Sequence, residues 1–325
     1  MRGPTSATDL RIRPFAEQDY PALTALFNAV YSDYPFSEEE ARHDDARYDG
    51  SRLVLRRLVA VTLAGDIVGA AEFHHVRDMY DPQKFQVGLS VHPDHRRQGI
   101  GARLYTDLTD LMAPFDPVVL WAWTRETWPD GVKFAVDRGF REVRRAWESR
   151  LDVAAFDPAP FQARADAALE GLTVTTLAEE KRINPRWLQD VYELHQEVSA
   201  DIPRPDTFTP QSLEQYQQGV LGNPGHMPEA HFLVKDGPRY TAESFMFKSA
   251  ELSDVLYQGL TATRRPYRGR GVAFAVKLHT IAFARKHGAR EIRTWNDTLN
   301  EPMLRINVKL GFARQPAWIT FEMRL

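Results

Sequence analysis

An internal repeat limits the possible folds of this 325-residue chain more than any other feature of its sequence. A segment that begins at Gly88 reads GLSVHPDHRRQGIGARL, and a segment that begins at Gly259 reads GLTATRRPYRGRGVAFAVKL. Both are typical of a short strand, a turn and a helix. We therefore expect two copies of one architecture in tandem.

The spacing of residues around the repeated segment supports a duplication. In both copies a tryptophan follows the arginine of the turn by 27 residues and a phenylalanine follows it by 44, while a glutamate precedes the first glycine by 16. One extra residue in the second turn is the only irregularity. These landmarks are Glu72, Arg96, Trp123 and Phe140 in the first copy and Glu243, Arg268, Trp295 and Phe312 in the second.

Each copy shows strands and helices in the same order, which indicates an α/β fold with a mixed sheet and helices on both faces. The stretch with Pro158 and Pro160, followed by an alanine-rich turn, is the best linker candidate. We therefore predict two domains, at residues 1–155 and 172–325, joined by a linker at residues 156–171.

Composition excludes several classes of protein. With 41 Lys and Arg against 44 Asp and Glu, the net charge is −3, so a polycationic nucleic-acid binder is not expected. The lack of cysteine excludes disulfides, cysteine nucleophiles and thiolate metal sites, and it fits a reducing compartment. No apolar stretch has the length of a signal sequence or a membrane span. We expect a cytoplasmic protein, a monomer or homodimer, that binds neither membranes nor nucleic acid.

The glycine turn of each copy is suited to bind an anion. Glycines stand where the next helix begins, so several backbone N–H groups have no intrahelical partner, and the helix dipole adds partial positive charge. A glycine also allows close approach to the backbone. The turn lacks the Gly-Lys-Ser/Thr ending of a P-loop and the Gly-x-Gly-x-x-Gly spacing of dinucleotide-binding proteins. Hydrolysis of a nucleoside triphosphate and binding of a nicotinamide cofactor are therefore disfavoured.

The pattern Arg-x-x-Gly-x-Gly/Ala after a strand resembles the acetyl-coenzyme-A pyrophosphate loop of the GNAT N-acetyltransferase superfamily. It is met by Arg96, Gly99 and Gly101, and again by Arg268, Gly271 and Ala273. The stretch TWNDTLNEPMLRINVKLGF resembles that family's next strand and helix. The resemblance covers nearly the whole chain as two GNAT-like domains. It implies an enzyme that transfers an acetyl or short acyl group from coenzyme A to an amine of a small molecule.

The resemblance also implies which residues bind acetyl-CoA, through the strand before the turn, the turn itself and the next strand and helix. In the first copy they are Ser90, Val91, Arg96, Arg97, Gln98, Gly99, Ile100 and Gly101. In the second copy they are Thr261, Ala262, Arg268, Gly269, Arg270, Gly271, Val272, Ala273, Asn296, Asn300 and Asn307.

The resemblance also implies that two adjacent parallel strands splay apart and hold the pantetheine arm of the cofactor in the gap. A carboxylate near these splayed strands is the usual base for the incoming amine. Glu243 is the first candidate and Glu72 its counterpart; alternatively, such a glutamate pairs with an arginine on the sheet. The second copy is favoured as catalytic because it has Asn296, Asn300 and Asn307 where the first copy has Thr124, Trp128 and Ala135. Asn300 is also well placed to cap the helix that follows it. His92 and His95 lack further ligands, so no metal is expected.

The sequence assigns neither a general acid nor a specific acceptor. Many GNAT enzymes carry a tyrosine, as general acid, at the position of Ala135 and Asn307, so no acid is assigned here. This leaves a non-catalytic acyl-CoA-binding sensor or assembly module as the alternative function. Loop aromatics such as Tyr31 either line an acceptor pocket or seal the edge of the domain, and we expect sealing. The acceptor is expected to be a small-molecule amine of unspecified identity.

Overall fold

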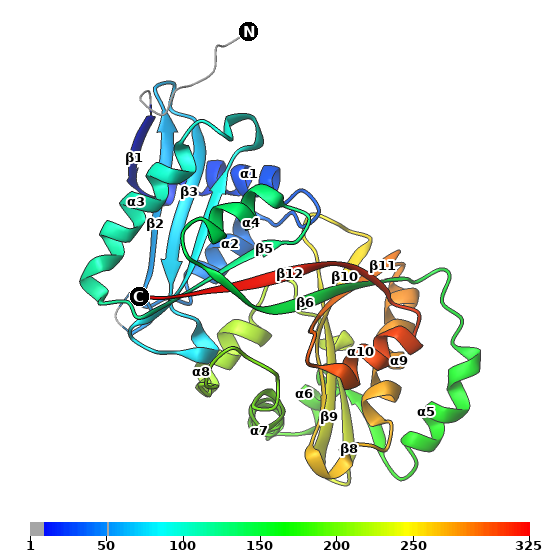
Figure 1. Cartoon of the computed structure of the whole chain (residues 1–325). Coiled ribbons are helices and arrows are strands. Elements are labelled where there is room, and N and C mark those ends of the chain that lie inside the picture. Colours follow the sequence, from blue (N-terminus) through cyan, green and yellow to red (C-terminus); the bar gives the residue numbers. More distant parts are fainter. Residues whose placement is uncertain (1–9, 51) are drawn as a thin grey trace. The chain divides into compact units, whose positions relative to one another are not determined.

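The computed structural model describes residues 10–50 and 52–325, and the chain divides into two compact units. The first unit extends to Val143 and also contains Ile319–Leu325, while the second unit comprises Arg144–Trp318. These units differ from the predicted limits of 1–155 and 172–325 because each copy contributes its closing strand to the other unit. We refer to them as unit 1 and unit 2 (Figure 1).

Unit 1 is built on a sheet in the order β1-β2-β3-β4-β5, with the end of β12 beside β5. All strand pairs from β1 to β4 are antiparallel, and β4 and β5 are parallel. Its strands are β1 (Leu10–Pro14), β2 (Leu55–Thr62), β3 (Ile67–His74), β4 (Lys84–Val91), β5 (Val119–Arg125) and the end of β12 (Ala313–Arg324); its helices are α1 (Tyr20–Val30), α2 (Glu38–Asp45), α3 (Ile100–Met112) and α4 (Pro129–Val136).

Unit 2 repeats this plan in the order β6-β11-β10-β9-β8-β7, and β10 and β11 are its parallel pair. Its strands are β6 (Arg141–Asp152, which belongs to unit 2 from Arg144 onward), β7 (Thr173–Thr176), β8 (Phe232–Asp236), β9 (Arg239–Lys248), β10 (Val255–Thr263) and β11 (Glu291–Asp297). Its helices are α5 (Gln162–Ala168), α6 (Leu177–Ile183), α7 (Trp187–Ser199), α8 (Leu213–Tyr216), α9 (Val272–His287) and α10 (Glu301–Lys309).

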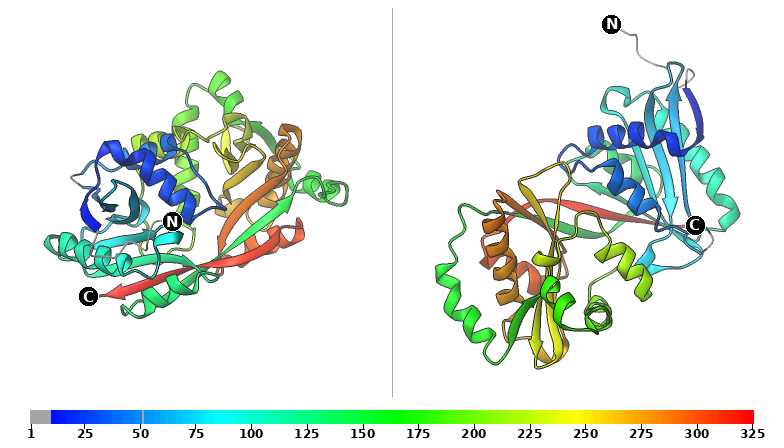
Figure 2. Two further views of the ribbon diagram at one scale, coloured as in Figure 1. Left: turned by 90° about the horizontal axis from the view of Figure 1, so that it is seen from above. Right: turned by 180° about the vertical axis from the view of Figure 1, so that it is seen from behind.

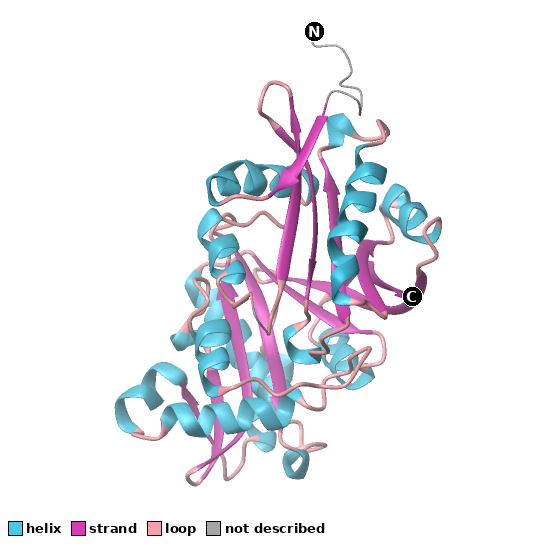
Figure 3. Cartoon of the chain, turned by 90° about the vertical axis from the view of Figure 1, so that its left-hand side faces the viewer, coloured by secondary structure: helices cyan, strands magenta, loops and turns pink. Residues whose placement is uncertain are grey.

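Helices cover both faces of each sheet, as Figure 3 shows. In unit 1 the apolar stripe of α1, with Leu23 and Leu26, packs on the face that presents Ala70. Leu104 of α3 packs with Phe73 on the opposite face, since residues three apart in a strand point to opposite sides. This arrangement confirms the predicted α/β class with a mixed sheet.

The parallel pair separates in both units before it reaches the glycine turn. In unit 1 the pairing of β4 with β5 runs from Lys84 with Val119 to Gln86 with Trp121. In unit 2 the pairing of β10 with β11 ends at Tyr257. A strand edge is therefore left without a sheet partner on its way to the turn, which is the opening that the resemblance implies for the cofactor arm.

Candidate active site

The glycine turn of unit 1 has the geometry of an anion cradle. Helix α3 begins at Ile100 with Gly99 as N-cap, and both Arg97 (φ 62°) and Gly99 (φ 81°) have left-handed backbone conformations. A left-handed residue within such a turn directs successive N–H groups to one side, where they can bind an anion. The Nε of Arg96 donates to the backbone oxygen of Val91 and holds the arginine over the turn (3.2 Å).

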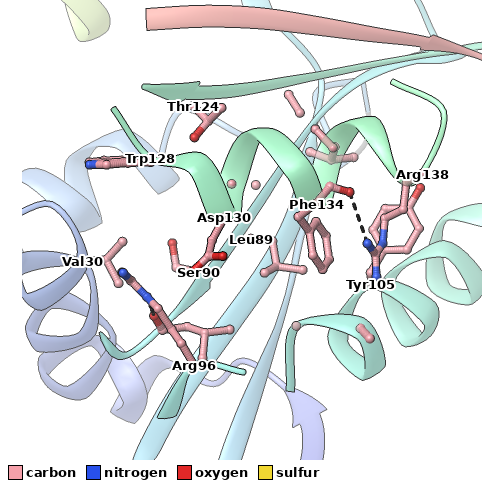
Figure 4. A pocket seen from close by; sticks show the side chains of 18 of the residues that line it. Val30, Leu89, Ser90, Arg96, Tyr105, Thr124, Trp128, Asp130, Phe134 and Arg138 are labelled. Atoms are coloured by element: carbon pink, nitrogen blue, oxygen red, sulfur yellow. Dashed lines mark hydrogen bonds between the residues drawn. The ribbon is translucent and has the colours of Figure 1, made fainter. Parts of the chain in front are cut away.

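A cavity of about 610 Å³ opens beside this turn, within the range of small-molecule and cofactor sites. It lies between β4, β5, α3 and α4 and reaches the end of α1 (Figure 4). Of the predicted cofactor residues of unit 1, those that line it are Ser90, Val91, Arg96, Arg97, Gly99, Ile100 and Gly101. Gln98 instead donates a hydrogen bond to the backbone oxygen of Asp94 (3.4 Å).

The wall of the cavity near α4 is aromatic and cationic. The guanidinium of Arg138 stacks over the Phe134 ring at 3.4 Å and donates to the Phe134 backbone oxygen. Tyr105 of α3 faces the same pair, as Figure 4 shows. Gly101 lies between Phe134 and β4, and a Cβ at that position would come within 3.4 Å of the Leu89 and Phe134 side chains. The glycine therefore keeps this part of the cavity open.

Glu72 does not itself line the cavity, but it lies opposite Gly88, which does, in the pairing of β3 with β4. Its Oε2 accepts from Arg57 Nε (2.6 Å), so the arginine pairing considered from the sequence is present. Its Oε1 lies 3.9 Å from His74 Nδ1 and 3.6 Å from the position that a Cβ of Gly88 would take. One carboxylate oxygen is thus held by Arg57 while the other faces β4.

The Arg57 pairing keeps this carboxylate ionised. Burial alone would raise the pKa of Glu72, but the positive charge of Arg57, with His74 and the Arg57 hydrogen bond, outweighs burial and leaves the pKa below its usual value. Arg57 is itself held by Asp45, whose Oδ2 accepts from Nη1 at 2.7 Å. Glu72 is therefore part of a hydrogen-bonded network with Arg57 and Asp45.

Tyr31 lines the cavity as well, although the sequence suggested that it seals the domain edge. It is the C-cap residue of α1, its hydroxyl is hydrogen-bonded to the Ser90 side chain, and its ring lies 5.3 Å from that of Trp128. Burial raises the pKa of the phenol, the Ser90 hydrogen bond partly offsets this, and the nearby Glu72 charge raises it further. No sequence signal distinguishes Tyr31 from other loop aromatics, because its contacts come from distant strands.

In unit 2 the glutamate does not occupy the equivalent place. The register of β9 with β10 differs from that of β3 with β4: Met246 lies opposite Gln258, and after a one-residue shift between Gln258 and Thr261, Glu243 lies opposite Ala262 and not opposite Gly259. Phe245, two residues further along β9, takes the position that Glu72 has in unit 1. A Cβ on Gly259 would lie 2.3 Å from the Phe245 ring. The predicted equivalence of Glu243 and Glu72, which rests on equal spacing, is therefore wrong, because the two strand pairs differ in register and a β-bulge adds one further residue.

Glu243 is fully buried between two histidines. Its Oε1 lies 2.9 Å from His195 Nδ1 and its Oε2 lies 3.2 Å from His231 Nε2. Burial by itself would raise the pKa of this carboxyl, but the two histidines outweigh burial and lower the pKa to about 2. Both carboxylate oxygens are engaged within the core of unit 2.

Side chains occupy the region of unit 2 that corresponds to the unit 1 cavity. Lys277 and Asn307, which stand where unit 1 has Tyr105 and Ala135, are each 1% exposed. Lys277 Nζ donates to Asn307 Oδ1, and Asn307 Nδ2 donates to Asn296 Oδ1 (2.7 Å). Phe274, at the position of Ala102, is also buried. Two of the predicted cofactor asparagines are thus bonded to each other, and one of them, Asn307, is also bonded to a buried lysine.

The glycine turn of unit 2 keeps its shape, but helix α5 packs against its last glycine. Gly269 (φ 75°) and Gly271 (φ 89°) repeat the conformations of the first turn. Helix α5, which lies within the predicted linker, packs along α9, and a Cβ on Gly271 would lie 3.2 Å from Ala168 Cβ (Figure 2). Arg268 pairs with Asp201.

The other predicted residues of unit 2 also have partners within the unit. Thr261 Oγ1 is 2.8 Å from Ser244 Oγ, Val272 is buried, and the Arg270 guanidinium lies 5.5 Å from the Tyr267 ring centre. Ala273 lies in the first turn of α9. Asn300 is the N-cap of α10 and accepts from Met303 N (3.4 Å), which confirms the capping role considered from the sequence.

Comparisons with known proteins place these features in a family. The family model of the acetyltransferase (GNAT) family matches residues 20–140, which contain the cradle, Glu72 and all the residues that line the cavity except Phe321. Residues 20–140 of the chain thus match the GNAT family. Together with the acetyltransferase relatives described below, this match supports the predicted acyltransferase activity and the acetyl-CoA cofactor.

Relatives and solved structures of similar length support the tandem arrangement. Mycothiol acetyltransferases from Thermobispora bispora and Geodermatophilus obscurus are 27% and 24% identical; the first comparison covers 70% of this chain and 72% of the relative, the second 96% of both. A GCN5-related N-acetyltransferase from Sphaerobacter thermophilus has the same fold (TM-score 0.71, 20% identity, 98% of this chain and 97% of that one). So does a tandem GNAT protein from the clavulanic acid biosynthesis pathway (TM-score 0.72, 18% identity, 97% and 98%).

Two kinds of feature are absent from the described residues. Among residues 10–50 and 52–325, no group of three or more His, Asp or Glu side chains is arranged to hold a metal ion. Within the same residues, no helix combines the length and the apolar character needed to cross a membrane.

Proposed function

We propose that unit 1 catalyses transfer of an acetyl group from acetyl-CoA to the amine of a small molecule, and that unit 2 is a non-catalytic partner domain. One observation carries this proposal. The same path from the glycine turn to the splayed strands is an open cavity in unit 1 and is filled by buried side chains in unit 2. The assignment departs from the expectation that the second copy is catalytic, which rested on its asparagines.

The residues of unit 1 fit the cofactor. The N–H groups at Gly99–Gly101, with Arg96, would bind the diphosphate, and the unpaired edge of β4 at Ser90 and Val91 would hold the pantetheine arm. When bound, acetyl-CoA supplies the thioester carbon that the amine attacks. Gly101 has no side chain to obstruct this path.

Glu72 is proposed to receive the proton of the amine, directly or through one water. An amine with a solution pKa near 10 is almost fully protonated at neutral pH, so a nearby base is required. The Oε1 of Glu72 faces Gly88 on β4, while Arg57 holds Oε2 and fixes the direction of the carboxylate. An ionised carboxylate at this place also attracts a cationic acceptor.

Binding of acetyl-CoA to matched variants tests the assignment of the two units. Gly101→Glu and Ala273→Glu each place an acidic side chain in the first turn of the corresponding helix, α3 or α9, where it repels a diphosphate without opposing the helix dipole. Titration calorimetry should show one site in the parent protein, lost in Gly101→Glu and kept in Ala273→Glu. Two sites in the parent, or loss only in Ala273→Glu, contradicts the assignment.

Release of free thiol then separates an enzyme from a sensor. Acetyl-CoA is incubated with a panel of small amines and with the protein, and the thiol is followed by a colorimetric reagent. Thiol release that depends on an amine and is absent in Gly101→Glu supports acetyl transfer by unit 1. Tight binding of acetyl-CoA without thiol release from any amine favours the alternative, a non-catalytic acyl-CoA-binding module.

A further inference from the structure

The departing sulfur of the cofactor requires a proton donor, and the described helix α4 offers no tyrosine for this role. The tyrosines that line the unit 1 cavity are Tyr31 and Tyr105. Tyr105 belongs to the wall near α4, where its ring faces Arg138 and Phe134. Tyr31 lies at the other end, beside the edge of β4. The two phenols therefore serve different parts of the cavity.

The contacts of Tyr31 place its hydroxyl where the thioester would react. The hydroxyl is hydrogen-bonded to Ser90, which is two residues from Gly88 on the same face of β4. Glu72, opposite Gly88, lies on that face as well. The phenol, the carboxylate and the unpaired strand edge thus converge on one short segment, although they come from α1, β3 and β4.

We infer that Tyr31 is the proton donor to the thiolate that leaves during acetyl transfer in unit 1; this inference rests on the proposed function. The amine nitrogen attacks the thioester carbon and loses a proton to Glu72. The carbon–sulfur bond breaks, its electron pair remains on sulfur, and the Tyr31 Oη–H proton moves to that sulfur. Glu72 then returns a proton to the phenolate through solvent, so that the products are an amide and free coenzyme A.

The surroundings of Tyr31 keep its hydroxyl protonated before the reaction. Burial raises the pKa of the phenol, and the ionised Glu72 adds to this, whereas Ser90 and the positive charge of Arg96 lower it. The net effect is a pKa above the usual value, so the proton is present at neutral pH. Ser90 also restricts the direction in which the hydroxyl points, and the Trp128 ring restricts the phenol ring from the other side.

The test uses the sulfur of the product as a probe. Tyr31→Phe removes only the hydroxyl, and Tyr34→Phe, whose residue does not line the cavity, is the matched control. Coenzyme A and desulfo-coenzyme A are titrated into each protein by calorimetry. The parent and Tyr34→Phe should bind coenzyme A about tenfold more tightly than the desulfo analogue, because a hydrogen bond to sulfur is lost in the analogue. Tyr31→Phe should bind both with equal affinity, at the desulfo level.

Turnover gives a second readout. With a saturating amine, kcat of Tyr31→Phe should fall about 10²-fold while the KM for acetyl-CoA stays within a factor of about two, as expected for loss of a general acid. Unchanged kcat together with an unchanged preference for coenzyme A overturns the inference alone. Loss of desulfo-coenzyme A binding in Tyr31→Phe indicates a structural role and overturns it too. A parent protein that binds neither compound overturns the proposed function as well.

Discussion

The buried Lys277 should make the stability of unit 2 depend strongly on pH. Its amine is 1% exposed, and burial lowers its pKa from 10.5 to about 7. In the unfolded chain the pKa returns to an ordinary value near 10.4. Between these values the unfolded state binds one more proton than the folded state, so the free energy of unfolding rises with pH. Below pH 7 both states are charged, and the folded state bears the full cost of burying the charge.

The size of this change in the free energy of unfolding follows from the difference between the folded and unfolded pKa values of Lys277. One pKa unit corresponds to about 1.4 kcal/mol, so a separation of roughly three units corresponds to about 4 kcal/mol between pH 7 and pH 10. Lys277→Met keeps a side chain of similar length and removes the titrating group. We therefore expect the variant to gain stability over the parent at pH 6.5 and to lose about 4 kcal/mol of that advantage by pH 10.

Urea unfolding followed by tryptophan fluorescence measures this difference at pH 6.5, 8, 9 and 10. Lys286→Met, on an exposed position of the same helix, is the control and should differ from the parent by less than about 0.5 kcal/mol throughout. A difference between Lys277→Met and the parent that does not change with pH would refute the reasoning. It would mean that Lys277 stays charged in the folded protein.

Three other predictions concern single side chains. Glu72→Gln should lower kcat about 10²-fold and leave the affinity for acetyl-CoA unchanged, by steady-state kinetics and calorimetry, because only the base is lost. Glu243→Gln should destabilise the protein by about 3 kcal/mol at pH 7, since it removes a buried carboxylate that is hydrogen-bonded to two histidines. The pKa of Glu243 is lowered to about 2, so its contribution is complete above about pH 4.5 and is lost as pH falls toward 2; the two proteins should converge in urea unfolding near pH 2.5. Asn300→Ala should cost about 1 kcal/mol through loss of the α10 cap without weakening cofactor binding, measured by thermal unfolding and calorimetry.

The duplication and the glycine turns could be read from the sequence because they depend on local rules. Gly99 and Gly271 are needed where the backbone is left-handed, and both helices begin within one residue of them. Equal spacing of landmarks then gave the order of strands and the parallel pair. Asn300 was also accessible, since a cap acts on residues only three positions away.

The sequence could not show that the region beside the glycine turn is open in unit 1 and filled by side chains in unit 2. The register of β9 with β10 places Phe245 where spacing alone placed Glu243, and no local pattern marks that register. Lys277 reads as an ordinary helix residue, and only contact with Asn307 shows that it fills space. The role of Tyr31 depends on Ser90, 59 positions later in the chain. Such outcomes depend on tertiary packing between distant segments.

The exchange of closing strands has a consequence for how the chain is made. Phe321 of β12 lines the cavity of unit 1 and Ile319 belongs to the same apolar cluster, while Trp121 Nε1 donates to Glu322 (3.2 Å). The ribosome adds these residues only after the rest of the second copy. Unit 1 therefore cannot complete the wall of its cavity before the second copy has been synthesised, and a chain that stops within the second copy lacks part of that wall. Synthesis through β12 becomes the condition for an intact cavity.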